Sequence, residues 1–236
     1  MSKSINIFGF HSIESLLKTN PESIIKVLIQ SNRKDKRAND LINILTSHKI
    51  PFSTTDRNDL DRMANGEVHQ GVISEVILPP LLNEESLLNS ISGNSTRPLI
   101  LILDSIQDPR NLGACLRSAN AAGVKHVVIN KDGSAAINAL VHKTSAGAIN
   151  TLRIYHVTNL SRTIKDLQKR GIWVIGLDGN SKSTIYDVNL TDATAIVMGS
   201  EGKGIRRLIK ETCDQIVTIP MSGNIESLNV SVATGI

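Results

Sequence analysis

The sequence predicts an α/β fold, with a parallel sheet in its second part and a smaller α/β domain before it. Six short apolar runs follow one another between residues 99 and 219. Several of them are almost continuously apolar, which is typical of strands that are buried on both faces. Amphipathic stretches separate most of these runs. Alternating strands and helices of this kind favour a parallel sheet.

The first part of the chain contains fewer and weaker signals. Short apolar runs predict two strands, and apolar residues at helical spacing predict two helices. In chain order, the candidates are a helical face at Ile13, Leu16 and Leu17, a strand at Ile24–Ile29, a helix over Asp40–His48 with Leu41, Ile44 and Leu45 on one face, and a strand at Val68–Ile77.

The second part carries the six strand candidates. They are Leu99–Leu103, His126–Ile129, Leu152–Val157, Ile172–Leu177, Ala195–Met198 and Gln215–Ile219. Leu112–Ala122 and Leu160–Arg170 have the spacing of amphipathic helices. Each is followed by a glycine, Gly123 or Gly171, at the position where a helix C-cap belongs.

A domain boundary is predicted between these two parts. A strand-like run ends in a Pro-Pro pair at residues 79 and 80, and a polar, turn-rich stretch leads to Pro98. We therefore expect a first domain at 1–77, a linker at 78–97 and a second domain at 98–236. Charge divides in the same place: residues 1–96 have a net charge of −1, and residues 97–236 have a net charge of +5.

The composition excludes several classes of protein. Of the 236 residues, 40% are hydrophobic and 20% are charged, which is a globular composition. No apolar run approaches the roughly 18 residues of a membrane span, and no signal-peptide core is present, so we expect a cytoplasmic protein without a membrane partner. The histidines and the two cysteines form no metal-ligand pattern. Six aromatic residues are too few for a stacking platform along single-stranded RNA.

Three loops that follow predicted strands combine glycine with polar residues. They begin at Asp104, Gly199 and Pro220. Ligands bind at the carboxyl ends of strands in open α/β sheets, so these loops predict one assembled site. None of them has the spacing of a phosphate-binding loop, a dinucleotide fingerprint or a hydrolase nucleophile elbow. Such a site favours a cofactor that brings its own reactive group.

The same loops resemble the three motifs of the SpoU-type RNA 2′-O-ribose methyltransferases. Asn111–Arg117 matches N-x-G-x-x-x-R, and Gly199–Gly204 matches G-x-E-x-x-G. Ile219-Pro-Met followed by Ser227–Ala233 matches the third motif. The order of the motifs agrees with the family. The likeness is greatest to the bacterial members that methylate a guanosine ribose in the peptidyl-transferase loop of 23S rRNA.

The resemblance implies a fold and a cofactor. The family fold is an α/β sheet with a trefoil-knotted C-terminal segment, often preceded by a small L30e-like domain that binds the RNA substrate. The cofactor is S-adenosylmethionine. The matching positions place cofactor binding at Gly199, Ile219 and Leu228, with Met198 and Met221 beside them. Gly199 would let the backbone approach the ligand closely. Ile219 and Leu228 either wall the adenine or belong to the core.

The resemblance also implies which residues act on the acceptor ribose. These are Arg117, Asn111, Glu201, Ser227 and Asn229. Arg117 would stabilise the developing alkoxide or anchor a phosphate. Asn111 would cap its helix or touch the ribose. Glu201 would pair with Arg117 or accept hydrogen bonds from backbone amides.

Partner predictions follow from charge and from the resemblance. The basic run that contains Arg33, Lys34, Lys36 and Arg37 is either a solvated loop or a phosphate-contacting patch. Lys203, Arg206 and Arg207 either line a phosphate path or form a solvated helix face. We expect an RNA partner, most simply 23S rRNA, no DNA partner and a homodimer. Two alternatives remain open: a tRNA methyltransferase of the same family, and a non-catalytic RNA-binding or ribosome-assembly protein. Family helices continue past the position of Ile236, so we expect a longer natural chain.

Overall fold

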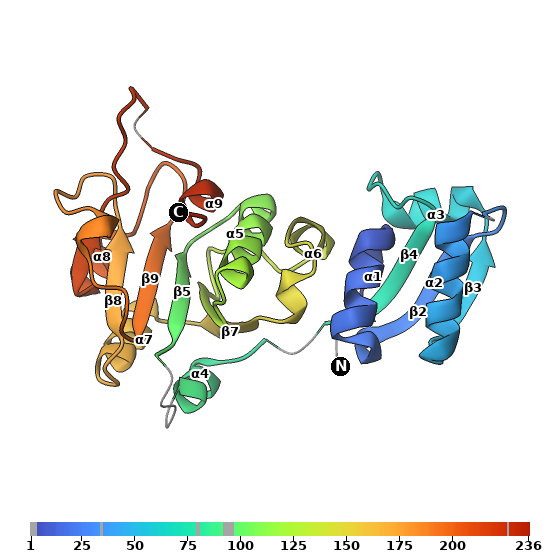
Figure 1. Ribbon diagram of the computed structural model, residues 1–236, viewed down its shortest axis with the longest axis horizontal. Helices are drawn as coiled ribbons and strands as arrows, with labels where there is room; N and C mark the ends of the chain where they lie inside the picture. Colours follow the sequence, from blue (N-terminus) through green and yellow to red (C-terminus); the bar gives the residue numbers. More distant parts are fainter. Residues whose placement is uncertain (1–3, 34, 79–80, 92–96, 226) are drawn as a thin grey trace. The chain divides into compact units, whose positions relative to one another are not determined.

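The computed structural model describes residues 4–33, 35–78, 81–91, 97–225 and 227–236. The chain divides into two compact units (Figure 1). The first unit comprises Met1–Pro80 and Ile137–Asn150, and the second comprises Leu81–Ala136 and Thr151–Ile236.

The first unit is built on a mixed four-stranded sheet. Its strands are β1 (Ser4–Phe8), β2 (Ile24–Gln30), β3 (Phe52–Thr55) and β4 (Val72–Ile77), in the spatial order β1-β4-β2-β3. β4 pairs antiparallel with both β1 and β2, whereas β3 runs parallel to β2. The predicted strand at Val68–Ile77 therefore begins only at Val72. Two strands, β1 and β3, have no counterpart among the predicted elements.

Three α-helices complete the main segment of the first unit. They are α1 (Phe10–Thr19), α2 (Lys36–Ser47) and α3 (Arg57–Ala64), with a 3₁₀ turn at η1 (Pro21–Ser23). Asp35 and Asp56 cap α2 and α3 by accepting hydrogen bonds from backbone N–H groups of the first turn. Leu41 and Leu45 are buried as predicted, but Ile44 is 39% exposed. The core-facing side of α2 therefore includes Ala38 instead of Ile44.

Residues 137–150 belong to the first unit, although they follow β6 in the chain. They contain α6 (Ala139–Thr144) and η2 (Ala148–Asn150), and α6 packs against β1. Lys143 of α6 forms an ion pair with Glu67, with 2.9 Å between Nζ and Oε2. The sequence predicts this segment as part of the second domain, because no local pattern reveals that α6 packs against β1, more than 130 positions away.

The second unit contains a six-stranded parallel sheet. Its strands are β5 (Leu99–Asp104), β6 (His126–Asn130), β7 (Arg153–Val157), β8 (Trp173–Leu177), β9 (Thr194–Gly199) and β10 (Gln215–Val217). Their spatial order is β10-β8-β9-β5-β6-β7, and every neighbouring pair is parallel. The six strands predicted from the apolar runs are confirmed, with shifts of one or two residues at their ends.

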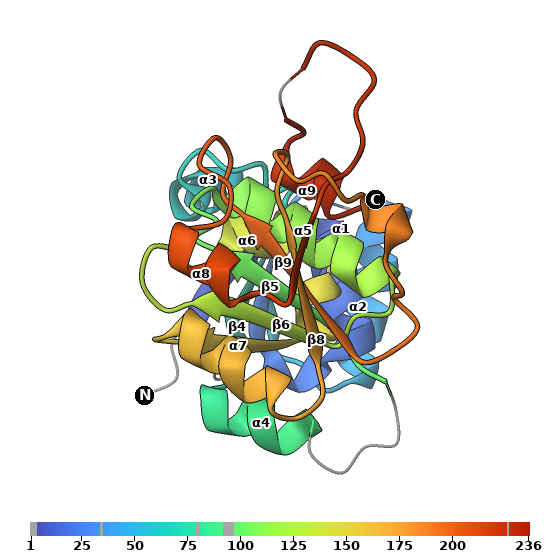
Figure 2. The ribbon, with the colours of Figure 1, turned by 90° about the vertical axis from the view of Figure 1, so that its left-hand side faces the viewer.

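Helices cover both faces of this sheet. They are α4 (Glu84–Ile91), α5 (Pro109–Ala121), α7 (Leu160–Gln168), α8 (Arg207–Thr212) and α9 (Val230–Ala233), with a 3₁₀ turn at η3 (Ile185–Asp187). Figure 2 shows α4 and α7 on one side of the strands and α5 and α9 on the other. Gly123 and Gly171 have the positive φ angles, 80° and 78°, that their predicted C-cap positions require.

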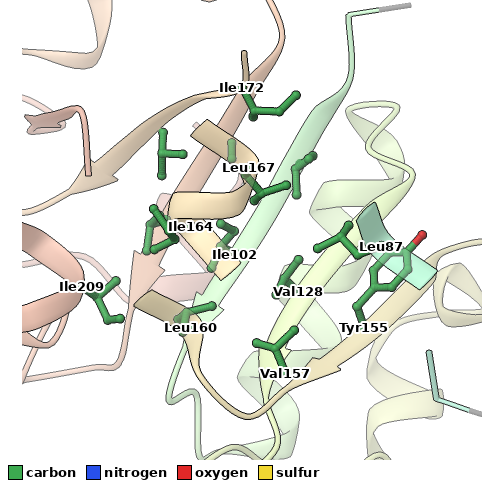
Figure 3. Packing of buried hydrophobic residues seen from close by; sticks show 14 of the residues in the cluster. Leu87, Ile102, Val128, Tyr155, Val157, Leu160, Ile164, Leu167, Ile172 and Ile209 are labelled. Atoms are coloured by element: carbon green, nitrogen blue, oxygen red, sulfur yellow. The ribbon is translucent and has the colours of Figure 1, made fainter. Parts of the chain in front are cut away.

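One core of the second unit lies between the sheet and α4, α7 and α8. Figure 3 shows Leu160, Ile164 and Leu167 of α7 gathered with Ile102 of β5 and Val128 of β6. This core holds the sheet rigid beneath the loops at its carboxyl edge.

The segment predicted as a linker is partly structured. It contains α4, whose Leu87 is fully buried in the same core, and Leu82 pairs with Tyr155 of β7 in an isolated bridge. Apolar residues in a short, polar-flanked segment gave too weak a periodicity to predict this helix. Within the described ranges, no helix is long and apolar enough to cross a membrane.

Candidate functional site

The main pocket of the second unit lies at the carboxyl edge of the parallel sheet and has a volume of about 920 Å³. Four segments line it: Leu177–Asn180 after β8, Met198–Gly204 after β9, residues 218–221 after β10, and residues 227–233 around the start of α9. The carboxyl ends of parallel strands meet at one edge, which explains why residues up to 56 positions apart share one pocket.

A tight hairpin forms one wall of the pocket. Ser200 and Gly204 exchange two backbone hydrogen bonds, of 3.1 Å and 2.8 Å, so that Glu201 and Lys203 lie at the tip. Gly199 precedes the hairpin, and a Cβ at this position would lie 2.0 Å from the carbonyl carbon of Gly204. The requirement for glycine at position 199 therefore comes from the hairpin backbone. The close approach of the cofactor to the backbone of Gly199 stays a prediction.

The five predicted cofactor-binding residues come together in this pocket. They are Met198, Gly199, Ile219, Met221 and Leu228. Met198 is buried, while Ile219, Met221 and Leu228 are half-buried with surface in the pocket. Ile219 and Leu228 are therefore wall residues of the pocket and not ordinary core residues.

Asn229 joins the three predicted motifs. Its Nδ2 donates a hydrogen bond to Oδ1 of Asn111, at 3.2 Å, and another to Oε1 of Glu201. Its Oδ1 accepts from the backbone N–H of Ser231, at 2.9 Å, which caps α9. One side chain thus fixes a helix start while it connects α5 with the β9 hairpin. We call Asn111, Glu201 and Asn229 the polar cluster.

Two role predictions are corrected by this geometry. Asp108, not Asn111, caps α5, because its Oδ1 accepts from the N–H of Arg110 at 2.7 Å. Asn111 lies in the first turn of α5, and its side chain takes part in the polar cluster instead of capping the helix. Glu201 is bonded to Asn229, and in the described part of the chain it forms neither an ion pair with Arg117 nor a hydrogen bond with a backbone amide.

Arg117 and Ser227 are both exposed. Arg117 lies on α5, six residues after Asn111, and is not part of the pocket lining. Among the described residues it has no hydrogen-bond or ion-pair partner. Ser227 lines the pocket near Leu228. Their side chains are therefore available to a ligand.

Asp178 is a pocket residue that the sequence analysis missed. It directly follows β8, and its Oδ2 lies 2.9 Å from Nζ of Lys210 on α8. Burial alone would raise the pKa of Asp178, but hydrogen bonds from Lys210 and from the backbone N–H of Asn180 outweigh it, so the pKa is lowered. The signal was present, because Asp-Gly-Asn follows a predicted strand just as the three motif loops do.

Some of the predicted RNA-contacting side chains are paired with carboxylates of the protein, and others are exposed and unpaired in the described part of the chain. The guanidinium groups of Arg33 and Arg37 both lie over the buried Phe10 ring, with 4.5 Å and 4.8 Å between guanidinium carbon and ring centroid. Arg33 also pairs with Asp35, and Arg37 forms two hydrogen bonds with Glu14, of 2.9 Å and 3.0 Å.

The remaining cations are differently placed. Lys36 and Lys203 are exposed and have no partner within the described ranges. Lys34 lies outside the described residues. Of the four predicted basic residues in the first unit, only Lys36 is thus shown to be exposed and unpaired.

The pocket fits S-adenosylmethionine by size and by chemistry. Its volume is near the upper end of the usual range for small-molecule sites, about 300–1,000 Å³. Met198, Ile219 and Leu228 offer apolar surface for an adenine, and the loop backbones offer donors and acceptors. Asp178 and Glu201 supply negative charge beside a cofactor that carries a sulfonium and an ammonium group.

Comparison with known proteins identifies the family. The SpoU rRNA Methylase family matches residues 98–236, and the family described as RNA 2′-O ribose methyltransferase substrate binding matches residues 6–80. The chain belongs to the SpoU rRNA methylase family. Its predicted fold class, its S-adenosylmethionine cofactor and its activity as an RNA 2′-O-methyltransferase are thereby confirmed.

Curated relatives of this SpoU methylase match almost end to end. The chain is 48% identical over 234 residues to the 23S rRNA (guanosine-2′-O-)-methyltransferase RlmB of Haemophilus influenzae, covering 99% of this chain and 95% of the relative. It is 44% identical over 230 residues to RlmB of Escherichia coli K12, covering 98% and 94%.

Solved structures agree in fold. The SpoU methyltransferase AviRb of Streptomyces viridochromogenes, solved with AdoMet, superposes with a TM-score of 0.79 at 20% identity, covering 98% of this chain and 87% of AviRb. At this identity the likeness supports the fold alone.

Proposed function

We propose that this SpoU methylase transfers a methyl group to the 2′-hydroxyl of a guanosine ribose in bacterial 23S rRNA. The observation that carries the proposal is the polar cluster at the rim of the pocket, in a chain that aligns over nearly its whole length with enzymes named for this reaction. The setting would be the cytoplasm, where ribosomal RNA is assembled with its proteins.

The pocket residues and the polar cluster have separate tasks in this proposal. Met198, Ile219 and Leu228 hold the cofactor, which supplies an electrophilic methyl group on sulfur when bound. Asn111 and Glu201 orient the acceptor ribose, and Asn229 keeps them together. Methyl transfer requires the acceptor oxygen in line with the methyl group, so orientation supplies much of the rate.

Arg117 has an electrostatic task. A guanidinium remains protonated, so it is unsuited to remove the hydroxyl proton. We propose that Arg117 stabilises the negative charge that develops on the acceptor oxygen. Its exposure and its lack of a partner in the described residues support this role, because the positive charge is not neutralised within its own unit.

The RNA and the assembly are part of the same proposal. The first unit would bind the RNA around the target, with Lys36 contacting a phosphate. In the second unit, Lys203 would contact a phosphate near the pocket. The protein would act as a homodimer. Light scattering after size-exclusion chromatography tests the assembly, and a mass of about twice 25.6 kDa is expected.

A methylation assay tests the reaction and the target together. The protein is incubated with methyl-labelled S-adenosylmethionine and either 23S rRNA lacking 2′-O-methylguanosine or total unmodified tRNA, and the labelled nucleoside is identified. Label in 2′-O-methylguanosine of 23S rRNA is expected. Label only in tRNA would refute the proposed target, and cofactor binding by calorimetry without labelling of either RNA would favour the non-catalytic alternative.

A further inference from the structure

A buried ion pair lies beside the site but outside the three family motifs. Asp104 ends β5, and its side chain is completely buried. Arg206 directly precedes α8, and its guanidinium reaches Oδ1 of Asp104 from Nε at 2.8 Å and from Nη2 at 2.7 Å. The backbone N–H of Arg206 donates to Oδ2 of Asp104 at 2.9 Å.

This arrangement holds Arg206 by both its side chain and its backbone. Ser105 Oγ adds a further hydrogen bond to Oδ1 of Asp104, at 3.1 Å, so both carboxylate oxygens are satisfied. A buried carboxylate is tolerated only with such partners. Charge-assisted bonds of an arginine fork also fix direction more strictly than neutral ones. The position of Arg206 relative to β5 is therefore well determined.

Arg206 is two residues from the end of the pocket hairpin. Between Gly204 and Arg206 lies only Ile205, which is buried in the sheet–helix core. At its other end the hairpin leaves β9 at Gly199, which is paired in register with Asp104. Both ends of the hairpin that carries Glu201 are thus tied to the carboxyl end of β5.

These contacts close a ring around the site. From Asp104 the chain leads through the start of α5 to Asn111, and hydrogen bonds lead on through Asn229 to Glu201. The hairpin then leads to Arg206, which returns to Asp104. A displacement of the ion pair would be transmitted to Glu201 through the four residues that lie between Glu201 and Arg206 in the chain. The polar cluster lies on the opposite side of this ring.

We propose that Asp104 and Arg206 are positioning residues for methyl transfer. They hold the hairpin so that Glu201 keeps the acceptor oxygen in line with the methyl group of the cofactor. The inference rests on the proposed function for the identity of the reaction. Neither residue lines the pocket. Their effect is expected in the rate of the bound complex rather than in the binding of cofactor or RNA.

The competing role for Arg206 is contact with an RNA phosphate, because its side chain is 52% exposed. The two roles differ in their consequences. A phosphate contact would appear in the KM for RNA, whereas positioning appears in kcat. Asp104 separates them further, since a completely buried carboxylate makes no contact with RNA.

Two substitutions test the pair. Asp104→Asn keeps the size of the side chain but turns an NH₂ donor toward the donors of Arg206. Arg206→Lys keeps the charge but cannot donate from two fixed nitrogens. Glu84→Gln is the matched control, because Glu84 also pairs with an arginine, Arg162 at 2.7 Å, and accepts from Thr163 on the side of α7, away from the pocket.

The measurements are kcat, the KM for RNA, the Kd of S-adenosylmethionine by calorimetry, and hydrogen exchange of the amides of residues 200–206. For both variants we expect kcat to fall about tenfold or more, as a displacement of about 1 Å in a reacting geometry can cause. The KM and Kd should stay within threefold of the wild-type values, and exchange at Gly204 and Arg206 should become faster. Glu84→Gln should change none of these.

Three results would overturn the inference. One is a kcat within threefold of wild type in folded variants. Another is a higher KM for RNA at unchanged kcat, which assigns Arg206 to phosphate. The third is unchanged exchange in the hairpin. If Asp104→Asn does not fold, Arg206→Lys decides. If the wild type itself transfers no methyl group, the proposed function fails, and the exchange data still decide whether the pair holds the hairpin.

Discussion

The arginines that the sequence singles out as ligand contacts are placed differently in the two units. In the first unit, Arg33 and Arg37 stand in the densest basic run of the chain, yet both are bound to carboxylates and stacked near Phe10. In the second unit, Arg117 is an isolated cation on α5, and it has no partner in the described part of the chain. Charge density along the sequence therefore indicates ligand contact poorly. A cation is structural when the fold brings a carboxylate within about 3 Å of it, and it is available to a ligand when the fold does not.

Among substitutions of these cations, Arg117→Ala is expected to have the largest effect, a loss of kcat. Removing a cation that stabilises the developing alkoxide should lower kcat about 10²–10³-fold, as loss of one oxyanion donor does. Because Arg117 is exposed and unpaired in the described structure, thermal stability should stay unchanged. Methylation assays and calorimetry check this, and a Kd for S-adenosylmethionine raised more than tenfold would contradict the assigned role.

Arg37→Gln should have the reverse effect: it should lower the stability of the protein and leave the methylation rate nearly unchanged. It removes two hydrogen bonds to Glu14 and a cation above the Phe10 ring. Both contacts are partly exposed, so we expect the free energy of unfolding to fall by only about 1 kcal/mol. Chemical denaturation measures this change. A methylation rate reduced as strongly as that of Arg117→Ala would show that Arg37 acts on RNA directly.

Lys36→Gln tests the unpaired cation of the first unit. If Lys36 contacts a phosphate, RNA affinity should fall uniformly across sequences, and the slope of log affinity against log salt should decrease by about 1. Stability should not change. Lys18→Gln, on the exposed side of α1, is the control, and an equal loss of affinity in both variants would indicate general electrostatic attraction instead of a contact.

The smallest effect is expected from pH. The hydrogen bond from Arg37 lowers the pKa of Glu14 below its usual value of 4.5, against the raising effect of burial. A lowered folded-state pKa stabilises the protein above pH 4.5, and this contribution is lost as pH falls through the folded-state value. Glu14→Gln should thus cost a few tenths of a kcal/mol at pH 7 and less at pH 3. A cost that grows on acidification would contradict this sign.

The second unit was more predictable than the first. Strands buried on both faces, such as β5 and β6, are almost purely apolar, so their ranges could be predicted within two residues. β1 and β3 have one exposed face or an exposed edge, and their mixed composition concealed them. α4 was missed for a similar reason, since only Leu87 of its eight residues is buried.

The candidate site could be predicted as a set of residues but not as a set of contacts. Motif spacing brought Asn111, Glu201 and Asn229 into one hypothesis, and the structure places them in one polar cluster. The individual pairings were wrong for Asn111 and Glu201. Asp178 was missed because no family motif contains it.

By itself, the sequence determined the α/β class, the strands of the parallel sheet, and the loops that carry the chemistry, because burial and glycine placement are local properties of the chain. Only the tertiary structure decided which charges neutralise one another, why Gly199 must be glycine, and how Asp104 meets Arg206. Those contacts join residues up to 102 positions apart and depend on distances of about 3 Å. The strand order β10-β8-β9-β5-β6-β7 sets these distances, and no local pattern encodes it.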